Sequence, residues 1–224
     1  MIKDYKYICL PYAGGSANIY NVWKNKNVVG IEYDGHGARY KKSFYKTIQQ
    51  AAERISDNIC KCEYEDYIIF GHSLGAIIAI ETMRVLTERE AMLPKKIIVS
   101  ASRPPHLLYK NEKISSLNKE LFMKKIFDMG SMPEEIMNNR EIFDLSYEVL
   151  YADISMLEMY QPSERIIVNV PLLVCFGNQD KEADWRDMIE WEKYTSSKFE
   201  LMCFKGNHFF IFDNDKIRNI VFNQ

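Results

Sequence analysis

The chain lacks long apolar runs and any large excess of charge of one sign. No segment approaches the roughly 20 apolar residues of a membrane span, and residues 1–6 lack the apolar stretch of a signal peptide. The 29 basic side chains nearly balance the 31 acidic ones, which gives a formal net charge of −2. That balance offers no global electrostatic case for binding nucleic acid or a membrane surface. We therefore expect a cytoplasmic protein that binds neither.

Cysteine is scarce and carries no metal-binding pattern. The five cysteines are Cys9, Cys60, Cys62, Cys175 and Cys203. The pair Cys60 and Cys62 lacks the spacing of metal ligands, and no paired cysteine or histidine motif accompanies it. We expect no metal and no cofactor. Cys9, Cys175 and Cys203 fall inside apolar runs, which predicts buried, reduced thiols.

The sequence also lacks internal repeats, low-complexity tracts and Pro/Gly-rich linkers. Its 224 residues, 47% of them hydrophobic, are enough to bury one substantial core. We therefore expect a single domain over residues 1–224, and a monomer.

Strand-like and helix-like segments alternate along the chain, which predicts an α/β fold with a mostly parallel sheet flanked by helices. Strands are expected at 7–10, 28–33, 68–70, 97–100, 172–176 and 199–204, and helices at 17–23, 47–60, 74–88, 183–194 and 215–222. Residues from about 103 to 165 hold helical patterns and no strand signal. Such an insertion would lie above the carboxyl ends of the strands, where these sheets bind ligands. We interpret it as a helical lid.

The run Gly71-His72-Ser73-Leu74-Gly75 is the most informative motif. An apolar strand-like segment precedes it and a helix-like segment follows, which is the strand, turn and helix of a nucleophile elbow. The two glycines suit a strained turn where strand and helix approach closely. Ser73 is therefore the candidate nucleophile, at a helix N-terminus that favours negative charge.

A nucleophilic serine needs a base and an orienting acid, which follow it in the chain order Ser, Asp or Glu, then His. Among the four histidines, only His208 fits that order well, because it lies after the last expected strand. Asp180 follows the fifth expected strand and is the preferred acid. Asp184 and Asp187 compete, but they fall in a helix-like segment where a carboxylate is usually a dipole partner or a surface charge.

An oxyanion hole usually combines the backbone N–H after the nucleophile with an N–H from a loop after an earlier strand. Leu74 is then the first donor. The loop from Pro11 to Ala17 contains Gly14-Gly15 and directly follows the first expected strand, so Ala13 is the second candidate donor.

These motifs resemble the type II (editing) thioesterases that accompany nonribosomal peptide and polyketide synthases, within the α/β-hydrolase superfamily. The similar segments are Pro11-Tyr12-Ala13-Gly14-Gly15-Ser16, Gly71-His72-Ser73-Leu74-Gly75-Ala76, Ser102-Arg103-Pro104-Pro105-His106, Gly130-Ser131-Met132-Pro133-Glu134-Glu135, Tyr151-Ala152-Asp153 and Lys205-Gly206-Asn207-His208-Phe209-Phe210. The family's catalytic Ser, Asp and His fall by motif on Ser73, Asp180 and His208. One departure is Asp34, which stands in Tyr33-Asp34-Gly35-His36-Gly37 where the family usually has a proline.

The resemblance implies an α/β-hydrolase fold with a helical lid at about 103–165. It also implies hydrolysis of acyl thioesters on the phosphopantetheine arm of acyl or peptidyl carrier proteins, which removes stalled or wrong acyl groups from a synthase. Because carrier proteins are acidic near the attachment point, one hypothesis is a basic docking surface drawn from Lys110, Lys113, Lys119, Lys124 or Lys125. The alternative is that these are scattered, solvated lysines of the helix surface.

Two other interpretations stay open. The first is a hydrolase of small esters or acyl-coenzyme A, which would share the triad residue types. The second is a carrier-binding or assembly protein that keeps the fold without turnover. Stoichiometric labelling of Ser73 by a fluorophosphonate separates an activated nucleophile from such an inactive scaffold.

Overall fold

The computed structural model describes residues 5–23, 27–62, 64–110, 113–129, 132, 134–162, 166–212 and 214–222. The chain forms one six-stranded sheet in the order β2-β1-β3-β4-β5-β6, with every neighbouring pair parallel. The strands are β1 (Lys6–Leu10), β2 (Val28–Gly30), β3 (Tyr67–His72), β4 (Lys96–Ser100), β5 (Leu172–Gly177) and β6 (Phe199–Phe204). The predicted α/β class and parallel sheet are confirmed.

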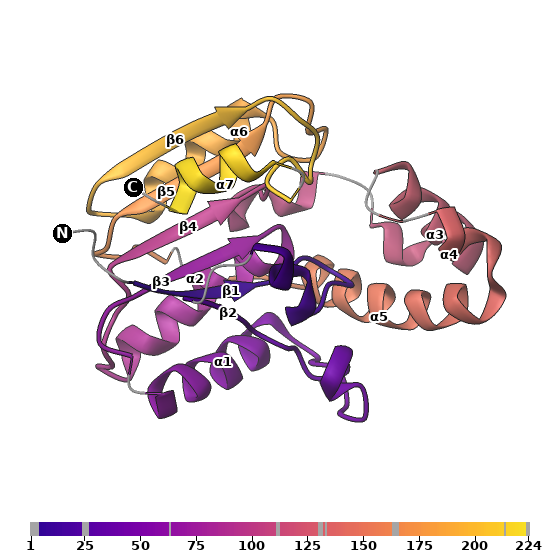
Figure 1. The fold of residues 1–224 in the computed structure, drawn as a ribbon, viewed down its shortest axis with the longest axis horizontal. Coiled ribbons are helices and arrows are strands. Elements are labelled where there is room, and N and C mark those ends of the chain that lie inside the picture. Colours follow the sequence, from indigo (N-terminus) through magenta and orange to yellow (C-terminus); the bar gives the residue numbers. More distant parts are fainter. Residues whose placement is uncertain are drawn as a thin grey trace.

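Helices cover both faces of the sheet (Figure 1). The α-helices are α1 (Ile48–Cys62), α2 (Leu74–Glu88), α3 (Lys119–Asp128), α4 (Glu134–Asn138), α5 (Arg140–Glu158), α6 (Trp185–Met188) and α7 (Asp215–Phe222). The 3-10 helices are η1 (Ala17–Trp23), η2 (Gly37–Arg39), η3 (Pro105–Lys110), η4 (Ile114–Ser116) and η5 (Ile189–Tyr194). Two predicted helices therefore differ in type: residues 17–23 form a 3-10 helix, and the 183–194 segment is α6 followed by η5.

Alternation along the strands divides the core into two clusters. In β1, Ile8 and Leu10 pack with α1, α2 and the α6–η5 segment, whereas Tyr7 and Cys9 pack with η1 and α7. Successive side chains of a strand point to opposite faces, so each face needs its own helical layer. Both sides of β3 and β5 are buried, which explains their continuous apolar sequences.

The edge strands account for two predictions that were wrong. β2 pairs only with β1 and ends at Gly30, short of the predicted residue 33. β6 is the opposite edge, and its side chains are half-buried except for Cys203, which is exposed. Cys9 and Cys175 lie on central strands and are buried, as predicted, and all five thiols are free. An edge strand has a neighbour on one side only, so an apolar run there does not guarantee burial.

The segment between β4 and β5, hereafter the insertion, carries η3, η4, α3, α4 and α5. It projects beyond the carboxyl ends of the strands, at the right of Figure 1. Gly130, Ser131 and Pro133 of the family-like segment lie outside the described residues, as does the side chain of Lys110. In the described parts of the chain, no helix is both long and apolar enough to cross a membrane.

Candidate active site

Ser73 occupies the turn between β3 and α2, with the predicted strand and helix on either side. Its backbone has φ +54° and ψ −116°, a conformation that L-residues rarely adopt and that concentrates at functional sites. A Cβ on Gly75 would lie 2.2 Å from the backbone oxygen of Leu10. Only glycine lets α2 start this close to the end of β1, and that proximity brings the Ser73 turn to the loop that follows β1.

His208 and Asp180 meet although they come from loops after different strands. His208 Nδ1 lies 2.8 Å from Asp180 Oδ2, and the exposed fractions of the two side chains are 10% and 1%. The second carboxylate oxygen of Asp180 accepts the backbone N–H of Glu182 at 2.8 Å. Both oxygens of the buried carboxylate are thus engaged, which fixes the orientation of the imidazole.

The competing acidic residues have other contacts. Asp184 caps α6 by accepting the backbone N–H of Arg186 at 2.8 Å. Asp187 forms an ion pair with Arg103 at 2.8 Å. Of the three candidate acids, the structure brings only Asp180 to the ring of His208.

Ser73 and His208 line one cavity of about 1060 Å³ between the sheet and the insertion. Its other walls come from the end of β4, from the η3–η4 region and from α3 and α5, together with Glu182. The lining includes apolar side chains such as Leu108, Met129 and Leu157, and also Lys113 and Lys125. The lining also contains Arg103, Glu158 and Glu182, so Ser73 faces a cavity with both apolar and charged walls.

The predicted oxyanion donors have no hydrogen-bond partner among the described residues. The N–H of Gly14 is taken by Asp153 at 2.8 Å, and that of Gly15 by the Tyr12 carbonyl at 2.9 Å. No such bond involves the N–H of Ala13 or of Leu74 in the part of the chain that the structure describes. Leu74 is the first residue of α2, where a free N–H is expected.

His72, the residue before Ser73, is fully buried and packs against the ring of His208. Its Nδ1 lies 2.9 Å from Ser100 Oγ, and its ring centroid lies 5.3 Å from that of His208. Burial lowers the pKa of His72 well below its usual value, and the positive charge of a protonated His208 would act in the same direction. His72 is therefore a neutral side chain next to Ser73 and His208.

Sequence reasoning missed one buried pair near the site. His36 Nε2 lies 2.9 Å from Asp153 Oδ2, and Asp153 is the residue that accepts the Gly14 N–H. Both residues fall in segments with family resemblance, but nothing in their sequence context signals a contact between positions 117 residues apart.

Comparison with known proteins identifies the family. The sequence model of the thioesterase domain family matches residues 6–223. The chain is 28% identical to linear gramicidin dehydrogenase LgrE of Brevibacillus parabrevis, over 89% of this chain and 79% of that protein. It is 27% identical to thioesterase PikA5 of Streptomyces venezuelae, over 93% of this chain and 76% of that protein.

A solved structure agrees with the sequence comparisons. The thioesterase RedJ of the prodiginine pathway in Streptomyces coelicolor superposes with a TM-score of 0.89 and 28% identity, over 99% of this chain and 86% of RedJ. The resemblance to type II thioesterases that the motifs predict is confirmed by these findings. This chain belongs to the thioesterase domain family and is an enzyme of the α/β-hydrolase fold.

Proposed function

We propose that this enzyme hydrolyses acyl thioesters through a triad of Ser73, His208 and Asp180. The observation that carries the proposal is the buried contact between His208 and Asp180 at 2.8 Å, with Ser73 and His208 on the wall of one cavity. Membership of the thioesterase domain family supports the reaction type.

The hydrogen bond to Asp180 determines how His208 works. A carboxylate only accepts, so Nδ1 carries the proton and Nε2 is left as the acceptor. Nε2 takes the hydroxyl proton of Ser73 as Oγ attacks the thioester carbonyl, and Asp180 stabilises the imidazolium that forms. The imidazolium then protonates the departing thiolate. Water, deprotonated by His208, cleaves the acyl-enzyme and releases a carboxylic acid.

The tetrahedral oxyanion is held by the backbone N–H groups of Ala13 and Leu74. Their freedom from other hydrogen bonds in the described chain supports this role. Leu74 also lies at the N-terminus of α2, a helix of 15 residues whose dipole favours negative charge there. Such pre-oriented donors are typically worth about 10²–10³-fold in kcat each.

We infer that the substrate is an acyl group on the phosphopantetheine arm of a carrier protein, and that the role is editing in nonribosomal peptide or polyketide synthesis. Relatives support this inference through their names, which include thioesterase PikA5 and gramicidin S biosynthesis protein GrsT of Aneurinibacillus migulanus. A cavity of about 1060 Å³ is large enough to accept a long, thin arm together with a short acyl chain.

Of the five lysines considered for carrier docking, two line the cavity that contains Ser73, which favours them over the others. Lys113 and Lys125 are exposed and line the cavity that contains Ser73. Lys119 pairs with Asp144 and lies over the ring of Tyr147, so it is already engaged within the insertion. We infer that Lys113 and Lys125 face the acidic surface of the carrier while its arm enters the cavity.

The decisive experiment compares release of one short acyl group from an acylated carrier protein and from coenzyme A, for wild type and Ser73→Ala. We expect faster hydrolysis on the carrier and a loss of about 10³-fold or more in Ser73→Ala. Equal rates on both substrates would reduce the function to that of a general thioesterase. No hydrolysis of either, with no labelling of Ser73 by a fluorophosphonate, would contradict the triad.

A further inference from the structure

A buried pair of charged side chains joins the insertion to the core beside the oxyanion loop. Asp153 belongs to α5, and His36 belongs to the loop after β2. Their side chains are only 5% and 3% exposed, and the contact is 2.9 Å long. Removing two ionisable groups from water is costly unless they are paired and hydrogen-bonded.

The hydrogen bonds of His36 show that it carries a positive charge. Nδ1 lies 3.2 Å from the backbone oxygen of Asp34, and Nε2 lies 2.9 Å from the carboxylate of Asp153. Both partners are acceptors only, so both ring nitrogens must donate. Burial by itself lowers the pKa of His36, but the hydrogen bond and the charge of Asp153 outweigh it and leave the pKa raised.

Asp153 reaches the oxyanion loop with the same oxygen. Oδ2 accepts the N–H of Gly14 at 2.8 Å. Gly14 has φ +76°, and a Cβ there would lie 2.6 Å from Cδ2 of Leu150, which sits one turn earlier in α5. Helix α5 thus holds Gly14 both by a charge-assisted hydrogen bond and by direct packing.

These contacts fix the direction of the Ala13 N–H. The carbonyl of Tyr12 and the N–H of Ala13 belong to one planar trans peptide and point in opposite directions. That carbonyl accepts the N–H of Gly15 at 2.9 Å, and the next peptide plane is held at Gly14 by Asp153. With the peptide planes on both sides of Ala13 restrained, its own N–H is set in one direction and remains free for a ligand.

We propose that Asp153 and His36 are positioning residues of the oxyanion hole, resting on the catalytic role proposed for Ser73. Asp153 holds the Gly14 peptide so that the Ala13 N–H is oriented before the substrate arrives. The positive charge of His36 compensates Asp153, which would otherwise oppose the negative charge that develops on the substrate oxygen in this buried region.

The position of Asp153 on α5 links the oxyanion hole to the substrate cavity. Leu145, Ser146, Val149 and Leu150 line a second cavity of about 350 Å³ together with Tyr12, Ala13 and Gly14, whereas Ile154, Leu157 and Glu158 line the larger cavity with Ser73. Asp153 lies between these two groups on the helix. The donor geometry at Ala13 is therefore complete only when α5 is seated on the core.

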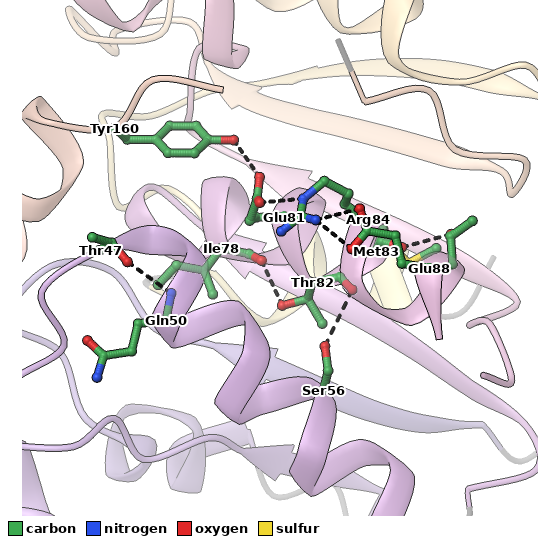
Figure 2. A network of polar contacts seen from close by, with 11 residues as sticks. Thr47, Gln50, Ser56, Ile78, Glu81, Thr82, Met83, Arg84, Glu88 and Tyr160 are labelled. Atoms are coloured by element: carbon green, nitrogen blue, oxygen red, sulfur yellow. Dashed lines mark hydrogen bonds and ion pairs between the residues drawn. The ribbon is translucent and has the colours of Figure 1, made fainter. Parts of the chain in front are cut away.

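The test uses the full-length protein with Asp153→Ala, Asp153→Asn and His36→Gln. The matched control is Tyr160→Phe, which removes another contact between the end of α5 and the core, from Tyr160 to Glu81 at 2.7 Å (Figure 2). Values of kcat and KM are measured for a short acyl thioester of a carrier protein and of coenzyme A. Thermal unfolding shows how much each variant destabilises the fold.

We expect Asp153→Ala to lower kcat by about 10–100-fold with KM changed less than about threefold, because losing the orientation of one donor costs less than removing it. Asp153→Asn keeps an acceptor for Gly14 and should recover much of the loss. His36→Gln leaves the negative charge of Asp153 without compensation and should also lower kcat. Tyr160→Phe should stay within about twofold of wild type.

The inference would be overturned if kcat of Asp153→Ala equalled that of the control. It would also be overturned if the substitution raised KM and left kcat unchanged. Should Asp153→Ala fail to fold, His36→Gln carries the test, and wild-type kcat in that variant would contradict the inference. Failure of the proposed function is distinguishable, because wild type would then hydrolyse neither thioester faster than Ser73→Ala does.

Discussion

At the scale of single residues, the turn that carries Ser73 packs against buried side chains that carry no charge. Ser73 holds its positive φ between a buried strand and a buried helix. His72 lies directly before it, fully buried, and is bonded through Nδ1 to Ser100 on the neighbouring strand β4. A charge at His72 would be both desolvated and close to His208, which explains why its pKa is lowered.

This lowered pKa predicts how stability depends on pH. In the unfolded chain His72 binds a proton below about pH 6.5, whereas in the folded protein it stays neutral to a much lower pH. The unfolded state then binds more protons, so the free energy of unfolding falls as pH drops below about 6.5. We expect His72→Asn to lose less stability between pH 7 and pH 5 than wild type does.

Urea unfolding of both proteins at pH 7, 6 and 5 measures this difference. All other titrating groups, His36 included, are common to the two proteins, so their contributions cancel in the comparison. Parallel pH profiles for wild type and His72→Asn would contradict a neutral His72.

At the scale of elements, α5 connects the insertion to the core through hydrogen bonds. Near its middle, Asp153 contacts the loop after β1, and just beyond its end Tyr160 donates to Glu81 of α2 (Figure 2). Glu81 is itself buried, and it also accepts from Arg84 at 2.6 Å. Glu158 accepts the N–H of Ile114 at 2.6 Å, which attaches η4 to the same helix. These contacts hold α5 at several points along the edge of the site.

The contact between Tyr160 and Glu81 should matter for stability and not for chemistry. Hydrogen bonds to charged groups contribute about 1.5–3 kcal/mol, and Arg84 still neutralises Glu81 when the tyrosine hydroxyl is removed. We expect Tyr160→Phe to lower the free energy of unfolding by about 1–3 kcal/mol, measured by urea denaturation. The rate of Ser73 labelling by a fluorophosphonate should be unchanged, and a tenfold slower rate would show that this end of α5 also shapes the site.

At the scale of the whole molecule, the net charge of −2 says nothing about where the charges lie on the surface. Lys113 and Lys125 line the large cavity that also contains Ser73. Opposite charges on two partners raise the rate of encounter more than they raise affinity at contact, and salt screens the effect. A protein without overall positive charge can in this way still attract an acidic carrier to one face.

Reversing the charges of Lys113 and Lys125 tests whether these two lysines attract the carrier. We expect the pair Lys113→Glu and Lys125→Glu to raise KM for an acylated carrier by about tenfold, because the attraction becomes repulsion. The change should shrink as salt rises towards 0.5 M, and should be much smaller for the same acyl group on a short thiol. The matched control reverses Lys61 and Lys95, at the opposite end of the strands, with the same change in net charge. Equal effects of the two pairs would contradict local docking.

The sequence predicted the central strands well and the edges poorly. Strands β1, β3, β4 and β5 are buried on both sides, so their apolar runs reflect a strong and uniform constraint. The end of β2 and the burial of Cys203 in β6 were predicted wrongly because strand order, and hence which strand lies at an edge, depends on contacts between distant segments. The length of the helix at 74–88 was predicted because its burial is nearly complete along the whole segment.

By itself, the sequence determined the alternation of strands and helices, the turn that carries Ser73, and the supply of a histidine and an acid in the right chain order. These are local properties, set by side-chain periodicity and by glycines that permit a tight turn. Only the tertiary structure decided that Asp180, and not Asp184 or Asp187, reaches His208, and that Asp153 joins His36 to Gly14. Those contacts join residues far apart in the chain, and only the packing of the sheet and the seating of α5 bring them within hydrogen-bond distance.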